Sequence, residues 1–125
     1  MARVLVVDDE DSMRLLVARA IAMEGHDIAS AADGAEALEL LGSAQAAFDL
    51  LLTDIQMPVM DGIALALTAA RDFPDLTILL MTGYADQRER ASGLNAIAYD
   101  VISKPFSVAD IRTAVADALA SRQDI

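Results

Sequence analysis

The sequence predicts a doubly wound α/β fold, in which helices cover both faces of a parallel β-sheet. The prediction depends on three apolar runs that each lead into charged residues. Apolar runs of this length are typical of buried strands in a parallel sheet. These runs, with the charged residues that follow them, are residues 4–7 with Asp8 and Asp9, residues 50–53 with Asp54, and residues 101–103 with Lys104.

The first half of the chain alternates between strand and helix signals. After the strand at residues 4–7, the acids Glu10 and Asp11 favour the start of a helix. Apolar residues follow at helical spacing as far as Met23, and Gly25 is expected to close the helix as its C-terminal cap. A short second strand is expected at residues 27–32. A second helix at residues 35–41 is expected to end near Gly42, and a third strand follows at residues 48–53.

The second half of the chain continues this alternation. Pro58 and Gly62 mark a loop at residues 56–62, and a third helix follows at residues 63–71. Strands are expected at residues 76–81 and 99–102, on either side of a short polar helix at residues 86–93. The last helix spans residues 107–120, with Ser107 as its N-cap and Asp110 as the capping-box partner.

Strands and helices in strict alternation predict right-handed crossovers, and therefore a parallel sheet. For five strands the expected arrangement is the flavodoxin-like (βα)5 order 2-1-3-4-5. In this order the first and third strands lie side by side at the switch point, where ligands bind at the carboxyl ends of the strands. Asp8, Asp9 and Asp54 should meet there.

Length and composition limit the classes of function. The 125 residues predict one domain, residues 1–125, with no separate output domain. A net charge of −11 argues against nucleic-acid partners and anionic membranes, and the absence of cysteine excludes disulfides and thiol catalysis. Because no signal peptide or membrane-spanning run is visible, we expect the protein in the cytoplasm.

The acidic residues predict a Mg²⁺ site. Carboxylates that crowd together repel one another, and a divalent cation relieves that repulsion. Mg²⁺ prefers oxygen ligands and retains several waters. We expect Asp9, Asp54 and the backbone carbonyl of Gln56 to be its protein ligands, with Asp8 acting through water.

The same residues predict phosphoryl transfer. An aspartate carboxylate is a competent nucleophile towards phosphorus, and the transfer needs mainly positioning and charge neutralisation. Asp54 is the expected nucleophile. The ammonium group of Lys104 would neutralise charge, and the hydroxyl of Thr82 would hydrogen-bond a phosphoryl oxygen.

With these marks, the whole chain resembles the receiver domain of two-component response regulators, the CheY-like superfamily. The matching residues are Asp8 and Asp9, Asp54, the loop residues Met57, Pro58, Met60, Asp61 and Gly62, then Thr82, and finally Lys104, Pro105 and Phe106. The resemblance implies that Asp54 accepts a phosphoryl group from a histidine kinase or a histidine phosphotransferase.

The resemblance also assigns roles to the neighbouring residues. It implies that Asp8 and Asp9 hold Mg²⁺, that Lys104 pairs with the phosphoryl oxygens, and that Thr82 moves towards them on activation. It implies a cis peptide bond before Pro105. The chain would then be a phosphoacceptor with slow self-dephosphorylation rather than an enzyme.

Two stretches, residues 61–66 and 79–91, are similar to the CpdR-type single-domain regulators of alphaproteobacteria. This narrower resemblance implies control of ClpXP-type regulated proteolysis and of the cell cycle. The implied output partner is a ClpX-type unfoldase or a protease substrate. The expected oligomeric state is a monomer or a weak dimer.

One position departs from the family pattern. An aromatic residue usually stands three positions before the lysine, and this chain has Val101 there. Because valine cannot switch by ring rotation, we expect a modified coupling. The candidate switch residues are Thr82, Tyr84, Tyr99 and Pro105.

Taken singly, these residues are also consistent with simpler roles. Asp8 and Asp9 are as easily helix N-cap acids, and Lys104 with Pro105 is as easily a solvated turn. A phosphate sink or relay intermediate would use the same Asp54 chemistry without an output partner. A haloacid-dehalogenase-like phosphatase is less consistent with the sequence, because that class needs an acid two residues after the nucleophile, where Gln56 stands.

Overall fold

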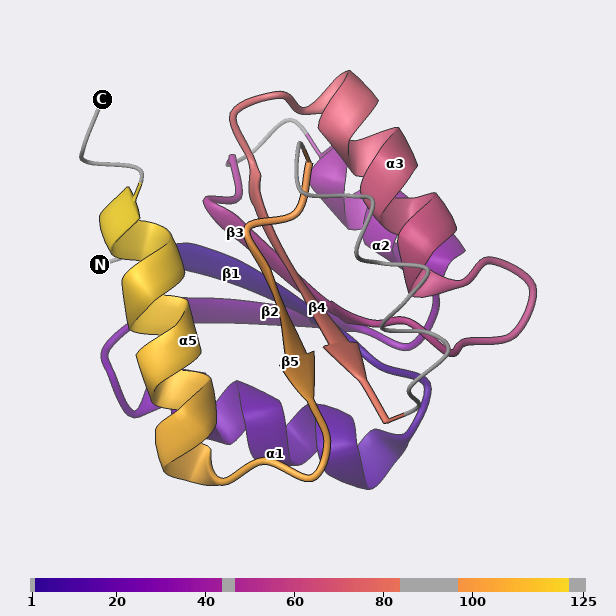
Figure 1. Ribbon diagram of the computed structural model, residues 1–125. Coiled ribbons are helices and arrows are strands. Elements are labelled where there is room, and N and C mark those ends of the chain that lie inside the picture. Colours follow the sequence, from indigo (N-terminus) through magenta and orange to yellow (C-terminus); the bar gives the residue numbers. More distant parts are fainter. Residues whose placement is uncertain (1, 44–46, 84–96, 122–125) are drawn as a thin grey trace.

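The computed structural model shows a five-stranded parallel sheet with the order β2-β1-β3-β4-β5 (Figure 1). The structure describes residues 2–43, 47–83 and 97–121. The elements in chain order are β1 (Arg3–Val7), α1 (Asp11–Ala22), β2 (Asp27–Ala31), α2 (Gly34–Leu41), β3 (Leu50–Asp54), α3 (Gly62–Asp72), β4 (Thr77–Thr82), β5 (Asp100–Ser103) and α5 (Val108–Ser121). The predicted fold class and strand order are confirmed.

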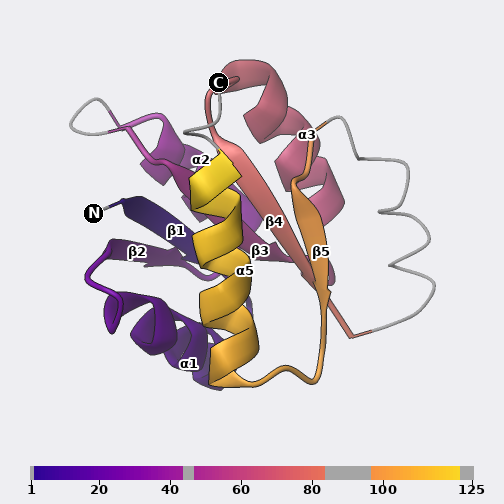
Figure 2. The same ribbon diagram turned by 60° about the vertical axis from the view of Figure 1, so that its left-hand side comes forward.

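Helices cover both faces of the sheet, as Figures 1 and 2 show: α1 and α5 lie on one face, and α2 and α3 lie on the other. Each face has its own apolar cluster, because successive side chains of a strand point to opposite faces. In β1, Val4 and Val6 pack towards α1 and α5, whereas Leu5 and Val7 pack towards α2 and α3. Burial on both faces explains why the strands are apolar runs without alternation.

The boundaries of the elements differ from the predictions by a few residues. The α1 helix ends at Ala22, and Gly25, the residue expected to close it, lies in the turn that follows with a left-handed φ of 88°. β3 begins at Leu50 rather than at residue 48, and it includes Asp54. The helix expected at residues 86–93 lies outside the residues that the structure describes.

The start of α3 corrects the expectation that Gly62 ends a loop. Gly62 is the first residue of α3, because the Asp61 side chain accepts a hydrogen bond from the backbone N–H of Ala64 (2.9 Å) and so caps the helix. The capping box of α5 is confirmed. Ser107 and Asp110 each accept a hydrogen bond from the other's backbone N–H, both at 3.0 Å.

Among the residues that the structure describes, no helix combines the length and apolar character needed to cross a membrane.

Candidate metal centre

The carboxyl ends of β1, β3, β4 and β5 meet at one edge of the sheet, and this edge carries the candidate site. The register pairs Val7 with Thr53 and Thr82 with Ser103, so the residues that follow these strand ends lie close together. They surround an open depression of about 640 Å³. Its lining residues are Asp8, Asp9, Glu10, Asp54, Gln56, Gly83 and Lys104.

Three carboxylates in this depression could hold one metal ion. Asp8, Asp9 and Asp54 each offer an oxygen, and these oxygens lie within 4.8 Å of one another. Asp8 and Asp54 are buried, whereas Asp9 is exposed and leaves the site open to solvent. An all-oxygen donor set with one open side fits Mg²⁺, which retains waters beside its carboxylate ligands. Gln56 also lines the depression.

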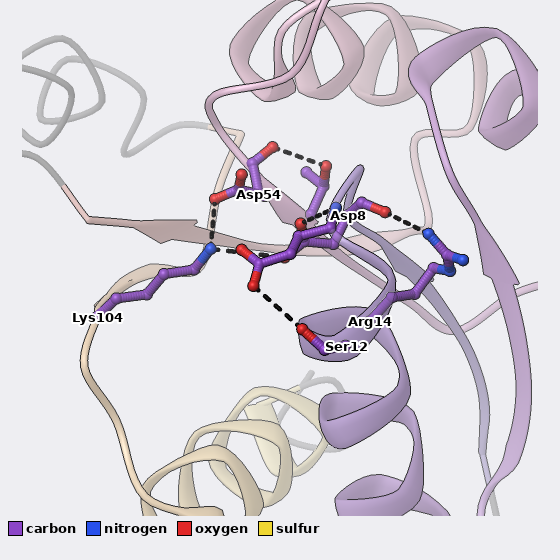
Figure 3. A network of polar contacts seen from close by, with 7 residues as sticks. Asp8, Ser12, Arg14, Asp54 and Lys104 are labelled. Atoms are coloured by element: carbon purple, nitrogen blue, oxygen red, sulfur yellow. Dashed lines mark hydrogen bonds and ion pairs between the residues drawn. The ribbon is translucent and has the colours of Figure 1, made fainter.

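Lys104 bridges two of the three carboxylates (Figure 3). Its Nζ lies 3.1 Å from Oδ1 of Asp54 and 3.5 Å from Oδ2 of Asp8. The backbone N–H of Lys104 donates to the carbonyl of Thr82 (2.7 Å), which ties the end of β5 to the end of β4. The Lys104–Pro105 peptide bond is cis, as the resemblance implied.

Burial is the largest influence on the pKa of the Asp8 and Asp54 carboxyls, and it raises both above the usual aspartate range. The Lys104 ammonium offsets part of each rise, and at Asp8 the backbone N–H of Glu10 does so too. Burial would lower the pKa of Lys104, but the two carboxylates outweigh it and hold this pKa above its usual value. The site therefore concentrates negative charge that one lysine does not fully neutralise.

The predicted switch residues differ in how close they lie to the three carboxylates. Thr82 is buried at the end of β4, next to Gly83 in the wall of the depression. Tyr99 precedes β5 and is exposed, so it lies at the end of that strand remote from Lys104. Val101 is half-buried against the α2 and α3 side of the core. Tyr84 lies outside the described residues.

Sequence reasoning missed Arg14 entirely, and it named Gly62 only as a loop residue without its contact with the backbone of Asp54. Arg14 in α1 donates to the backbone carbonyl of Asp8 (2.8 Å), and Gly62 places the start of α3 against the backbone of Asp54. A signal for Arg14 was available: it follows four consecutive acids and stands three residues after Asp11 on a predicted helix. For Gly62, no signal in the sequence distinguishes a close backbone approach from an ordinary turn.

The profile of the family described as "Response regulator receiver domain" matches residues 4–116. The chain belongs to this family. Two solved structures share its fold. The receiver domain protein from Clostridium thermocellum superposes with a TM-score of 0.88 at 21% identity, covering 98% of both chains, and therefore supports the fold. NtrX from Brucella abortus superposes with a TM-score of 0.88 at 31% identity, over 98% of this chain and 27% of that protein.

Curated relatives place this receiver domain among proteins of two-component signalling. The response regulator MprA of Mycobacterium ulcerans (strain Agy99) is 36% identical over 87% of this chain and 46% of its own length. The sensor kinase CckA of Brucella abortus (strain 2308) is 36% identical over 98% of this chain and 13% of its own. The regulator NtrC of Escherichia coli (strain K12) is 36% identical over 97% of this chain and 25% of its own.

The chain thus spans less than half the length of these curated relatives. They share its receiver domain and carry further sequence beyond it. None of the three bears on the narrower resemblance to CpdR-type regulators, which depends on residues 61–66 and 79–91 alone.

Proposed function

We propose that this receiver domain is a Mg²⁺-dependent phosphoacceptor in which Asp54 takes the phosphoryl group from a phosphohistidine. The observation that supports the proposal is the position of Asp54. Its carboxylate is buried, belongs to a cluster of three acids, and lies 3.1 Å from the Nζ of Lys104. The donor would be a histidine kinase or a histidine phosphotransferase.

In the proposed reaction, a carboxylate oxygen of Asp54 forms a bond to phosphorus while the phosphorus–nitrogen bond of the donor histidine breaks. The bonding electron pair stays on the imidazole nitrogen, and the product is an aspartyl phosphate. Asp8, Asp9 and Asp54 would hold Mg²⁺ with the carbonyl of Gln56. When bound, this ion supplies positive charge for the phosphoryl oxygens.

Lys104 would exchange its partners when the phosphoryl group arrives. In the structure its ammonium pairs with the carboxylates of Asp54 and Asp8. After phosphorylation of Asp54, the ammonium would pair with the phosphoryl oxygens instead. Thr82 would add a hydrogen bond from the end of β4. These new interactions bias the equilibrium towards the active conformation by their differential free energy in the two states.

The experiment that tests the phosphoacceptor is intact-mass measurement after incubation with acetyl phosphate, with and without Mg²⁺. We expect one added phosphoryl group on the wild type, and none on Asp54→Ala or without Mg²⁺. Asp72→Ala removes an exposed acid at the end of α3 and should leave the adduct unchanged. An adduct on Asp54→Ala would overturn the assignment of the acceptor.

We further propose that the phosphorylation state controls binding of an output protein to this domain's own surface, in regulated proteolysis of the ClpXP type that also serves the cell cycle. Support comes from the resemblance of residues 61–66 and 79–91 to CpdR-type regulators. The test is capture of a purified ClpX-type unfoldase by wild type and by Asp54→Ala, each treated with acetyl phosphate and Mg²⁺. If the amount of unfoldase captured is the same with and without phosphorylation, the proposed control of an output protein is overturned.

One observation favours a second candidate, a phosphorelay intermediate. The chain aligns along 98% of its length with a segment of the sensor kinase CckA, so a domain of this type also occurs within a kinase. In a relay, Asp54 would return its phosphoryl group to a histidine of another protein. Incubation of the phosphorylated domain with a purified histidine phosphotransferase distinguishes the two candidates, because only a relay intermediate labels that histidine.

A further inference from the structure

Arg14, which projects from the first turns of α1, contacts the backbone that carries the acidic cluster (Figure 3). Its Nη1 donates to the backbone carbonyl of Asp8 at 2.8 Å. Its Nη2 pairs with Oδ1 of Asp11 at 2.6 Å. The two ends of the guanidinium fork therefore hold different partners. Asp11 keeps the fork in place while Nη1 holds the carbonyl.

This contact completes the set of interactions that hold Asp8. Its backbone N–H donates to the carbonyl of Ala31 (3.2 Å), and its Oδ1 accepts from the N–H of Glu10 (3.0 Å). Its Oδ2 lies 3.5 Å from Nζ of Lys104. With Arg14 on the carbonyl, every polar atom of Asp8 has a partner, so its position and the plane of the peptide that follows it are both determined.

That peptide joins Asp8 to Asp9, and both residues belong to the carboxylate cluster. Asp9 is exposed, and its direction depends on the peptide plane that precedes it. Mg²⁺ demands near-ideal octahedral geometry, so its affinity is sensitive to small displacements of its ligands. A side chain that holds this peptide would therefore influence the binding of the ion without touching it.

We propose that Arg14 is a positioning residue for Mg²⁺ binding, which acts through the peptide between Asp8 and Asp9. The inference rests on the proposed function, because it presumes that the carboxylate cluster binds Mg²⁺. Loss of a group that orients a metal ligand typically weakens affinity by at least tenfold. For Arg14→Gln we expect the Kd for Mg²⁺ to rise on the order of tenfold.

Whether Arg14→Gln raises or lowers the Kd for Mg²⁺ distinguishes a positioning role from a purely electrostatic one. A guanidinium beside the site repels Mg²⁺, so removal of its charge alone would tighten binding. A positioning role predicts the opposite result, weaker binding when the charge is removed. Arg19→Gln is the matched control, since Arg19 is an exposed arginine in the last turn of the same helix. This control should leave the Kd unchanged or slightly lower.

The experiment is a titration of the wild type, Arg14→Gln, Arg14→Lys and Arg19→Gln with Mg²⁺ alone, followed by amide chemical shifts. Lysine keeps the charge but has no fork to hold both Asp8 and Asp11. We therefore expect Arg14→Lys to bind more weakly than wild type and more tightly than Arg14→Gln. Urea unfolding without Mg²⁺ shows in parallel that each variant is folded during the titration.

The outcomes distinguish this inference from the proposed function. If the wild type binds Mg²⁺ and Arg14→Gln binds it equally or more tightly, the positioning role is overturned and the phosphoacceptor stands. If the wild type binds no Mg²⁺, both are overturned. Should Arg14→Gln fail to fold, Arg14→Lys decides, and a Kd equal to that of the wild type overturns the positioning role.

Discussion

At the scale of single residues, the chemistry of the receiver site depends on how Asp8 and Asp54 share one cation. Lys104 lies within 3.5 Å of both carboxylates, yet burial still raises the pKa of each. Structural ion pairs usually lower the pKa of a carboxyl group. Here burial outweighs the effect of Lys104, so the ionised carboxylates keep an unfavourable environment that a divalent cation would relieve.

The raised pKa values predict how Mg²⁺ binding depends on pH. Mg²⁺ needs ionised ligands, and protons occupy Asp8 and Asp54 at a higher pH than they would an ordinary aspartate. The Kd for Mg²⁺ should therefore rise as the pH is lowered through a window that begins above the usual aspartate range. Titrations at successive pH values check this, with Asp72→Asn as a variant that should behave as wild type. A constant Kd down to that range would contradict it.

Lys104 and Mg²⁺ should compete for the same oxygens. We expect Lys104→Met to tighten Mg²⁺ binding on the order of tenfold, or about 1.4 kcal/mol, because a repelling charge is removed from the cluster. The same variant should lose the change in conformation that follows phosphorylation. Calorimetric titration gives the first result, and Arg71→Met is its control because Arg71 pairs with the exposed Asp72. Weaker Mg²⁺ binding by Lys104→Met would refute the competition.

At the scale of elements, the turn between β3 and α3 brings two backbones into contact beside Asp54. The N–H of Gly62 donates to the carbonyl of Ile55 at 2.7 Å. A Cβ on Gly62 would lie 2.1 Å from the backbone oxygen of Asp54, a separation at which the backbone must move. The first turn of α3 and the end of β3 thus support each other, and Asp61 caps the helix from the same turn.

Gly62→Ala should therefore destabilise the domain. We expect a loss of about 3 kcal/mol in the free energy of unfolding, because the new methyl group meets backbone rather than a flexible side chain. Gly42→Ala is the matched control: a Cβ there lies 3.4 Å from its nearest neighbour, the carbonyl of Leu38. Its change should stay within about 1 kcal/mol. Urea unfolding measures both, and equal stabilities would refute the argument from close approach.

At the scale of the whole molecule, the parallel sheet gathers charged residues that are far apart in the sequence. Asp8 and Lys104 are separated by 96 positions and still meet within 3.5 Å. Both faces of the sheet are buried, which holds the strand ends rigidly in register. The sheet also concentrates the repulsion among Asp8, Asp9 and Asp54, which a bound divalent cation would relieve.

Mg²⁺ should therefore stabilise the folded domain. At ten times its Kd, a ligand that binds only the folded state adds about 1.4 kcal/mol to the free energy of unfolding. We expect this gain in the wild type and a much smaller one in Asp54→Ala, which lacks one carboxylate of the cluster. Urea unfolding with and without Mg²⁺ measures the difference. Equal gains in the two proteins would show that Mg²⁺ binds elsewhere.

Much of the fold and of the candidate site was predictable from the sequence, because strand ends carry a local signal. An apolar run followed by a charge marks the same edge of a parallel sheet wherever it occurs, so Asp8, Asp9, Asp54 and Lys104 could be placed together. The capping box at Ser107 is likewise a local pattern. The exact bounds were less predictable, since β3 begins at Leu50 and not at residue 48.

The sequence by itself determined the fold class, the strand order and the set of charged residues at one edge. Only the tertiary structure decided which atoms of that set meet: Lys104 on both Asp54 and Asp8, Arg14 on a backbone carbonyl, and Gly62 against β3. The physical reason is the separation in sequence over which each interaction acts. Periodicity and capping act over a few residues, whereas these contacts depend on how strands and helices pack after the chain has folded.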